Sequence, residues 1–121
     1  MFNRGIRGAT TVQRNDEQEI LQATEELLNE IITRNVLDPE TVGSVWITMT
    51  TDLDAAFPAR AVRAIEGWDF VPLMCATEIP VQGSLPLCIR VMIQVNTEKN
   101  QREMRHVYLR GAQVLRPDLS K

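Results

Sequence analysis

The sequence predicts a single α+β domain, residues 1–121, with a mixed β-sheet and two helices on one of its faces. A length of 121 residues suits one domain with a sizeable core. Apolar segments with strand-like and helix-like spacing follow one another in the order strand, helix, strand, helix and three strands, which is typical of this class. No internal repeat, low-complexity tract or linker interrupts that order.

The N-terminal elements have the clearest patterns. Residues 3–12 predict a first strand. Residues 15–35 predict an amphipathic helix with acidic residues in its first turn and with Asn15 or Asp16 as the N-cap. One face of this helix is apolar, and we expect it to enter the core through Ile20, Ala23, Leu27, Leu28 and Ile31.

A second strand and a short helix occupy the middle of the chain. Residues 44–50 predict the strand, after a connector in which Pro39 begins a short helical turn. Pro58 suits the first position of the helix, and Gly67 suits its C-terminal end. The side chains expected to face the sheet are Ala59, Val62 and either Ile65 or Ala61. Arg60 and Arg63 would lie on the exposed side of this helix.

Three further strands complete the predicted sheet. They cover 70–79, 87–95 and 105–109, with a loop rich in Pro and Gly and a charged turn between them. The two helices cover one face of such a sheet, and no third long helix is predicted for the other face. We therefore expect self-association to bury the uncovered face.

Arg90 lies in the middle of the apolar strand at 87–95. Because side chains alternate along a strand, one face is β-branched and the other, which carries Arg90, is semi-polar: Ile89, Val91, Ile93 and Val95 against Cys88, Met92 and Gln94. A guanidinium taken out of water needs a partner for its charge. Two partners are possible, an internal Asp or Glu or a bound ligand.

Composition excludes several classes of function. No apolar run approaches the roughly 20 residues of a membrane span, and the N-terminus lacks the apolar segment of a signal peptide, so we expect a cytoplasmic protein. Cys75 and Cys88 are too few for a disulfide framework. The single histidine, His106, argues against a metal site. The net charge of -3 argues against nucleic acid or an anionic membrane as a partner.

Several arginines lie in or beside the predicted core elements, namely Arg7, Arg63, Arg90 and Arg116. The planar guanidinium makes two parallel hydrogen bonds to a carboxylate, so a small molecule with more than one carboxylate is a natural ligand. The alternative is that Arg63 and Arg116 are solvated surface residues.

Other polar residues have ordinary explanations from the sequence alone. Glu78 at a strand end suits a solvated acid, Tyr108 a packed strand tyrosine, and Cys75 a small buried apolar residue. One histidine gives little support to a Cys-His-acid triad, and no glycine-rich phosphate loop is present. The sequence therefore gives no sign of nucleophilic, metal or cofactor chemistry.

Five separated strings match one protein family in order and spacing almost from end to end: "RGIRGATTV", "FPARAVR", "VPLMCATEI", "CIRVMIQV" and "RHVYLRGAQVLRPDLS". Together they resemble the monofunctional, trimeric α/β class of chorismate mutase. The resemblance implies a fold related to the ferredoxin-like folds, assembled as a trimeric pseudo-barrel with active sites between subunits. It also implies conversion of chorismate to prephenate in phenylalanine and tyrosine biosynthesis, without cofactor or metal.

The reaction that the resemblance implies is pericyclic. A carbon-oxygen bond breaks as a carbon-carbon bond forms, with no proton transfer and no covalent intermediate, so the enzyme needs neither a nucleophile nor a base. Restraint of the flexible dianion and a fixed positive charge at the ether oxygen are what such a reaction can use. Arg90 matches the family arginine that donates to that oxygen and to a carboxylate.

The resemblance implies further roles, residue by residue. Arg7 is similar to a carboxylate ligand, and Tyr108 to a hydroxyl donor to the side-chain carboxylate. Glu78, assisted by Cys75, is similar to the acceptor for the ring hydroxyl, and it would favour the positive charge that develops on the ring fragment. Arg90, Glu78 and Arg7 are thus the implied catalytic residues. The remaining substrate-binding positions are Phe57, Met74, Ala76, Thr77 and Leu115 in the pocket, and Arg60, Arg63 and Arg116 at its mouth.

Two other functions stay open beside this one. A trimeric deaminase of enamines and imines has a similar fold and can carry a "FPAR" string, and ammonia release would identify it. A non-catalytic sensor of aromatic-pathway metabolites would use the same arginines, and tight binding of a prephenate-like dianion without turnover would identify it.

Overall fold

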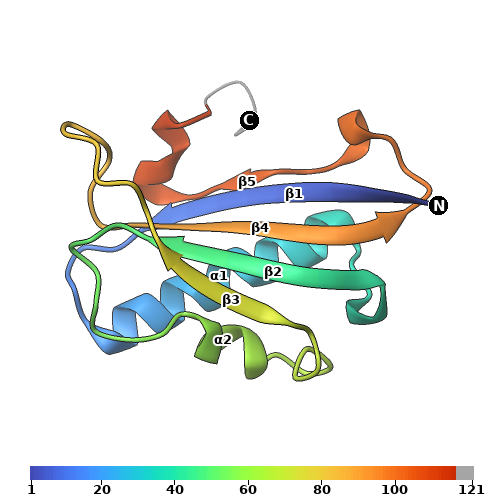
Figure 1. Ribbon diagram of the computed structural model, residues 1–121, viewed down its shortest axis with the longest axis horizontal. Helices are drawn as coiled ribbons and strands as arrows, with labels where there is room; N and C mark the ends of the chain where they lie inside the picture. The colour runs from blue at the N-terminus through green and yellow to red at the C-terminus, as the bar shows by residue number, and fades with distance from the viewer. Residues whose placement is uncertain (117–121) are drawn as a thin grey trace.

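A computed structural model describes residues 1–116 as one five-stranded mixed sheet with two α-helices on one face (Figure 1). The predicted fold class and order of elements are confirmed. The end of the string "RHVYLRGAQVLRPDLS", from residue 117 onward, lies outside the described residues. The elements are β1 (Phe2–Thr11), α1 (Glu17–Asn35), β2 (Val42–Met49), α2 (Ala59–Arg63), β3 (Leu73–Thr77), β4 (Cys88–Thr97) and β5 (Val107–Tyr108).

The strand order is β3-β2-β4-β1-β5. β4 is antiparallel to both of its neighbours, β1 and β2. β3 is parallel to β2, and β5 is parallel to β1. The first strand of the chain therefore lies between the last two.

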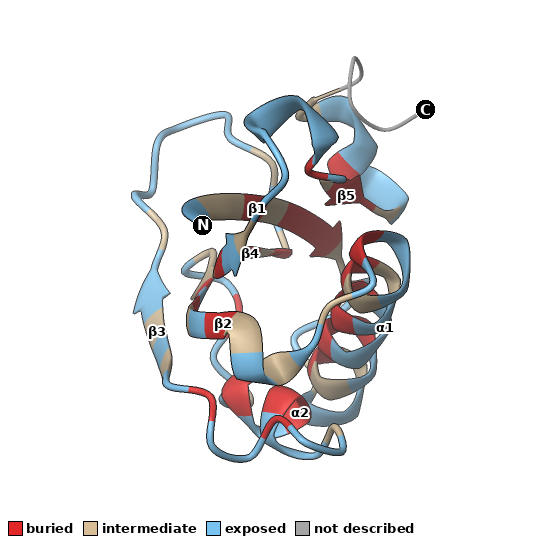
Figure 2. Ribbon diagram, turned by 90° about the vertical axis from the view of Figure 1, so that its right-hand side faces the viewer, coloured by how far each residue is buried: buried red, intermediate tan, exposed pale blue. Residues whose placement is uncertain are grey.

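Asp16 is the N-cap of α1, and its carboxylate accepts a hydrogen bond from the Glu19 N–H at 3.0 Å. This confirms one of the two predicted caps. The five apolar residues predicted for its inner face are all buried, and each buried aliphatic side chain of leucine or isoleucine size contributes about 1.5 to 3 kcal/mol to folding. Figure 2 shows these buried positions along the side of α1 that faces the strands.

Gly8 allows α1 and β5 to approach β1 closely. A Cβ atom at this position would lie 2.7 Å from Cδ1 of Ile31 and 3.1 Å from the carbonyl oxygen of Val107. Any larger residue would push one of these elements away, because well-packed interiors have no room for an added methyl group. The β-branched face of β4 packs on the same side of the sheet, where Ile89, Val91, Ile93 and Val95 are all buried, as predicted.

α2 ends at Arg63, earlier than the predicted stop at Gly67. The chain continues in tighter turns, in which the Ile65 N–H donates to the Val62 carbonyl at 3.1 Å and the Trp68 N–H to the Ile65 carbonyl at 3.0 Å. Gly67 takes a left-handed conformation with φ 87° inside this turn, and the Trp68 side chain that follows it is buried.

The other strands also differ in length from the prediction. β3 starts only after Pro72, which lacks the N–H that a sheet ladder needs. β5 has only two residues, because the chain before it is held by a side chain from α1. Among residues 1–116, no helix has the length and apolar character needed to cross a membrane.

Candidate active site

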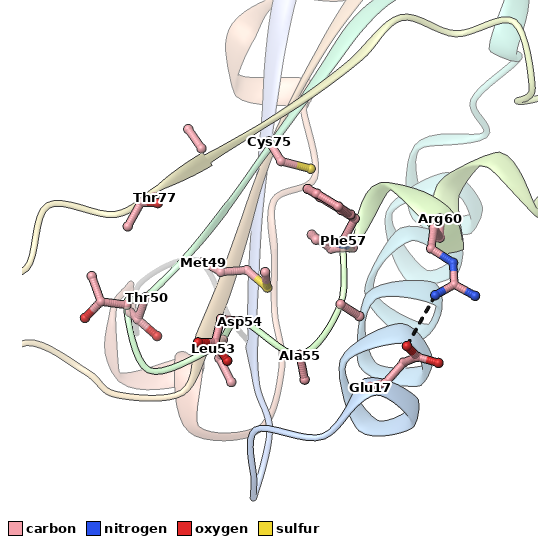
Figure 3. A pocket seen from close by; sticks show the side chains of 14 residues that line it. Glu17, Met49, Thr50, Leu53, Asp54, Ala55, Phe57, Arg60, Cys75 and Thr77 are labelled. Carbon is pink, nitrogen blue, oxygen red and sulfur yellow. Dashed lines mark ion pairs between the residues drawn. The ribbon is translucent and has the colours of Figure 1, made fainter.

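Two cavities contain most of the predicted site residues. The first, which we call the arginine pocket, has a volume of about 170 Å³ and lies on the sheet face opposite the helices; its lining includes Arg7, Trp46, Thr48, Glu78, Arg90 and Tyr108. The second, the Phe57 pocket, has a volume of about 620 Å³ and lies at the β3 edge beside α2 (Figure 3); its lining includes Phe57, Arg60, Cys75, Ala76 and Thr77.

Arg90 is only partly buried within one chain. It lies on β4 directly opposite Thr48 of β2, and its side chain is 39% exposed. The nearest acid is Glu78, with 3.6 Å between Nε of Arg90 and Oε2 of Glu78. The Nε atom is nonetheless buried and has no hydrogen-bond partner among the described residues. An acidic partner is therefore present, but it leaves a donor of the guanidinium unsatisfied.

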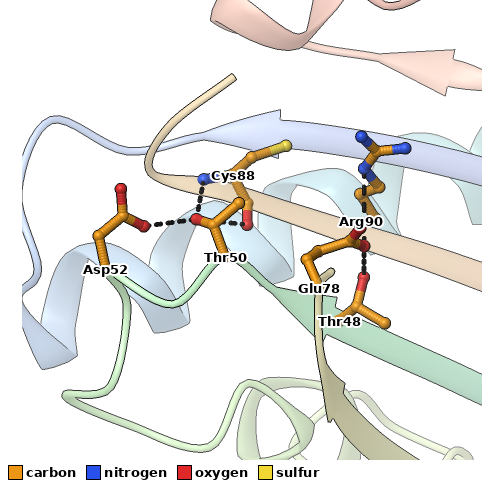
Figure 4. Close-up of polar contacts among 6 residues, drawn as sticks. All are labelled: Thr48, Thr50, Asp52, Glu78, Cys88 and Arg90. Atoms are coloured by element: carbon orange, nitrogen blue, oxygen red, sulfur yellow. Dashed lines mark hydrogen bonds and ion pairs between the residues drawn. The ribbon is translucent and has the colours of Figure 1, made fainter. Parts of the chain in front are cut away.

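Glu78 directly follows β3, and its backbone fixes it beside the end of β2. Its N–H donates to the Met49 carbonyl at 2.9 Å. Its carboxylate oxygen Oε2 accepts a hydrogen bond from the Thr48 hydroxyl, as Figure 4 shows. Sequence reasoning missed Thr48, because only the β2–β4 register places it opposite Arg90.

Tyr108 closes the arginine pocket on the β5 side. It is only 4% exposed, and its hydroxyl is buried without a hydrogen-bond partner in the part of the chain that the structure describes. An unsatisfied buried hydroxyl costs about 1 to 3 kcal/mol, so a bound acceptor would be favourable here. Leu115, another predicted pocket residue, packs against a small buried cluster formed by Ala9, Cys88, Tyr108 and Ala112.

Arg7 lies on β1 and contributes to the arginine pocket. Its backbone N–H donates to Nδ1 of His106 at 2.9 Å. Burial lowers the pKa of His106, and the positive charges of Arg7 and Arg116 lower it further. His106 was considered from the sequence only as a metal or triad candidate, whereas the structure places it next to a predicted carboxylate ligand.

A hydrogen-bonded clamp holds the start of β4. The Thr50 hydroxyl donates to the Asp52 carboxylate and accepts the Cys88 N–H at 3.0 Å (Figure 4). The other Asp52 oxygen accepts the Leu87 N–H at 3.0 Å. Leu87 has φ 52°, a left-handed conformation that is costly for a leucine and that the clamp maintains. The clamp acts two residues before Arg90 along the strand. Burial raises the pKa of the Cys88 thiol, despite the lowering effect of the Arg90 charge.

The Phe57 pocket has a different character. Phe57 is largely exposed, and Arg60 forms an ion pair with Glu17 at 3.5 Å (Figure 3). Cys75 lies opposite Ile47 in the β2–β3 pairing and packs against the main core, so it faces the helix side of the sheet. The cavity thus offers an aromatic ring, a cation and a strand edge.

The predicted site residues therefore form two groups within one chain. Cys75 faces the helices, and Arg90 faces away from them. Met74 and Arg63 line neither of the two cavities: Met74 is exposed beside Trp46 on the open face, and Arg63 is exposed on α2. The residues expected to bind one substrate are thus not collected in one cavity of a single chain.

Comparison with known proteins gives consistent matches over nearly the whole chain. The family chorismate mutase type I matches residues 3–119. Chorismate mutase AroH of Bacillus subtilis (strain 168) is 53% identical over 120 residues, covering 99% of this chain and 94% of that protein. Chorismate mutase AroH of Thermus thermophilus is 50% identical over 117 residues, covering 96% and 95%.

A solved structure agrees with these matches. The chorismate mutase from Clostridium thermocellum superimposes with a TM-score of 0.88 at 51% identity, covering 91% of this chain and 97% of that one. The fold and about half of the residues are therefore shared with these chorismate mutases. The chain belongs to the chorismate mutase type I family.

Proposed function

We propose that this chorismate mutase acts in sites completed by two neighbouring subunits of a homotrimer, with the arginine pocket of one subunit facing the Phe57 pocket of the next. The observation that carries the proposal is the position of Cys75 and Arg90 on opposite faces of one sheet. Side-chain rotation in a single chain cannot join these faces. A closed ring of copies can, because each subunit presents one face to the next.

The open sheet face supports the same assembly. Trp46 is 45% exposed and Met74 is 58% exposed, and the two residues lie opposite each other in the β2–β3 pairing. Adjacent exposed apolar side chains of this size are typical of surfaces that bury against a partner. A neighbouring subunit that covers them would also exclude water from the arginine pocket, which strengthens charge interactions inside it.

The chemistry assigned to the arginine pocket is electrostatic. Chorismate is a dianion whose ether oxygen gains electron density as its carbon-oxygen bond breaks. Arg90 brings an Nε donor that no atom of residues 1–116 satisfies and that this oxygen or a carboxylate can satisfy, and a positive charge that is present before the reaction begins. Since the charge is in place beforehand, little reorganisation is needed when the transition state forms.

The other residues of the pocket hold the substrate. Arg7 is assigned to one carboxylate, and the Tyr108 hydroxyl, which has no partner within residues 1–116, to the other. Glu78 is assigned to the ring hydroxyl, while its own carboxylate is oriented by Thr48. Fixing both ends of a flexible molecule in a chair-like geometry means that its conformational entropy is lost on binding. This loss then no longer adds to the activation barrier of the reaction step.

The cations outside the arginine pocket are assigned to substrate capture. Arg60 lies in the Phe57 pocket, Arg63 is exposed on α2, and Arg116 comes shortly after the 3-10 turn Arg110–Val114. Positive charges at the mouth of a site raise the rate at which a dianion enters it. A cytoplasmic location is proposed as well, since Cys75 and Cys88 are both free thiols, as suits a reducing compartment.

The test is the loss of chorismate ultraviolet absorbance with purified protein, with no added metal or cofactor, and with prephenate identified as the product. Rapid conversion by a species with the mass of three chains is expected. A folded monomer with full activity would overturn the shared-site proposal. Ammonia release from amino-acid-derived imines would instead point to the deaminase function considered from the string "FPAR".

A further inference from the structure

We infer that His106 is a positioning residue for Arg7: its imidazole takes the place of a ladder carbonyl between β5 and β1 and fixes the main chain from which the Arg7 guanidinium enters the arginine pocket. The inference concerns how the proposed site is held in shape and rests on Arg7 being part of that site.

The geometry of the ladder carries the inference. The Leu109 N–H donates to the Ala9 carbonyl at 2.9 Å, so the peptide groups of Ala9 face β5. Those of Arg7, two residues earlier on β1, face the same way. If the parallel pairing continued, the Arg7 N–H would donate to the Arg105 carbonyl. It donates instead to Nδ1 of His106, at 2.9 Å.

The reason for the replacement is that α1 occupies the backbone of Arg105. Asn35, the buried last residue of α1, donates from Nδ2 to the Arg105 carbonyl at 2.9 Å and accepts the Arg105 N–H on Oδ1 at 2.8 Å. The same Nδ2 also donates to the Ile31 carbonyl at 2.9 Å. Both backbone hydrogen-bonding groups of Arg105 are thereby bonded to α1 and not to β1. The imidazole of the next residue reaches β1 instead.

The direction of this hydrogen bond sets the chemical form of His106. A backbone N–H can only donate, so Nδ1 must be unprotonated and the ring must be the neutral tautomer with its proton on Nε2. An imidazolium would have no acceptor to offer. The neighbouring guanidinium of Arg7, the positive charge of Arg116 and the partial burial of the ring all favour the neutral form.

A shift of the Arg7 backbone has a large effect on the site, because the guanidinium is reached from Cα through a long side chain that amplifies small rotations. A displacement of about 1 Å at a substrate-positioning group can cost about 100-fold in rate. Without the imidazole, the Arg7 N–H would also lose its acceptor in a partly buried place.

Two substitutions at His106 distinguish the effect of losing the hydrogen-bond acceptor from the effect of losing the imidazole ring. His106→Ala removes the acceptor, and we expect kcat/KM for chorismate to fall about 10- to 100-fold, mainly through KM because Arg7 binds a carboxylate. His106→Asn is the matched control, since its Oδ1 can stand near the place of Nδ1 and restore kcat/KM to within about threefold of wild type. Full activity of His106→Ala, or equal losses in both variants, would overturn the inference.

A double-mutant cycle tests whether His106 acts through Arg7. In an Arg7→Ala background, His106→Ala is expected to have almost no further effect on kcat/KM. Additive losses would show a general structural role and contradict the inference. Circular dichroism and solution mass establish that each variant retains the fold and assembly of the wild type.

Nuclear magnetic resonance of the wild-type protein keeps the test decisive if His106→Ala does not fold. His106 is the only histidine in the sequence, so its ring ¹⁵N signals need no assignment. The Nε2–H tautomer is expected near neutral pH, and the Nδ1–H tautomer would overturn the inference. A wild-type protein that fails to convert chorismate would count against the proposed function, whereas the tautomer would still decide the hydrogen bond.

Discussion

Nε of Arg90 and Oε2 of Glu78 lie 3.6 Å apart, and the same carboxylate oxygen accepts the hydroxyl of Thr48. Side chains from β2, from β4 and from the residue that follows β3 thus meet at one oxygen atom. Partly exposed ion pairs contribute little to stability, typically about 0 to 1 kcal/mol. The arrangement therefore acts chiefly to orient the two side chains toward the arginine pocket.

Arg90→Ala is expected to lower kcat by at least about 100- to 1,000-fold, the loss typical of removing one donor that stabilises developing negative charge. The midpoint of thermal unfolding should change little, because the Arg90 side chain is 39% exposed in the chain and its ion pair is weak. Both quantities can be measured on the same preparation. Turnover near that of the wild type would contradict the role given to Arg90.

Arg34→Ala is a matched control for this experiment. Arg34 also forms an ion pair through Nε, with Oε2 of Glu30 at 2.9 Å, but it lies on the exposed C-terminal turn of α1. Its removal should leave kcat and KM unchanged. A comparable loss of activity in this variant would mean that the Arg90 effect is not specific to the pocket.

Thr48→Val is expected to lower kcat/KM about tenfold, because the valine keeps the shape of threonine but leaves Glu78 without its hydroxyl donor, and hydrogen bonds to charged groups contribute about 1.5 to 3 kcal/mol. Thr48→Ser keeps the hydroxyl and should retain most of the activity. Steady-state kinetics of the two variants side by side make the comparison. If serine and valine behave alike, the hydroxyl has no part in orienting Glu78.

Mixed trimers test whether two subunits share each site. Arg90→Ala damages the arginine pocket, and Phe57→Asp places a negative charge in the Phe57 pocket, where it would repel the dianion. Each variant alone should be nearly inactive. Co-expressed at equal levels, they should recover activity in about a quarter of the sites, since a ring pairs each arginine pocket with its neighbour's Phe57 pocket at random. An absence of recovery in verified mixed trimers would place each site within one subunit.

A pH titration tests the environment of His106. Its pKa should lie below the ordinary imidazole value of about 6.5, because burial and the charges of Arg7 and Arg116 favour the neutral ring. As the pH falls, the imidazole is therefore protonated at a higher pH in the unfolded chain than in the folded chain. This group thus contributes to the stability of the fold at pH values above its ordinary pKa. That contribution declines as the pH falls from the ordinary value through the lowered one.

The measurement combines a histidine titration by nuclear magnetic resonance with urea unfolding between about pH 5 and 8. The unfolding free energy of the wild type should rise with pH more steeply than that of His106→Asn, which lacks the titrating group. A histidine pKa above the ordinary value, or identical slopes for the two proteins, would contradict the expected sign.

Features written locally in the sequence were predicted correctly. The inner face of α1 follows from helical spacing, and the two faces of β4 follow from strand alternation. Asp16 was one of two candidate caps, because Asn and Asp are equally suitable residue types and only the structure shows which side chain reaches the Glu19 N–H. The order of elements and the fold class follow from the same patterns.

Features set by tertiary contacts were not accessible in this way. Cys75 and Arg90 lie on opposite faces of the sheet. Their relative orientation is fixed by the register of β3 and of β4 against the strand between them, β2. The short β5 depends on Asn35, which lies 70 residues before Arg105 in the sequence. Thr48 could not be predicted either, because only the pairing of β2 with β4 places it opposite Arg90. Periodicity assigns no residue roles, and the roles predicted above come from the resemblance to a known family.

The position of β1 between β4 and β5 has a consequence for synthesis of the protein. A ribosome completes β1 first, yet both of its hydrogen-bonding edges stay unpaired until the C-terminal part of the chain has emerged. Unpaired strand edges invite pairing with other chains, and contacts between distant parts of a sequence form slowly. Among the predicted site residues, Arg7 is therefore translated first and enclosed late. A truncated nascent chain that lacks β4 and β5 would expose the unpaired edges of β1 and would have no enzymatic activity.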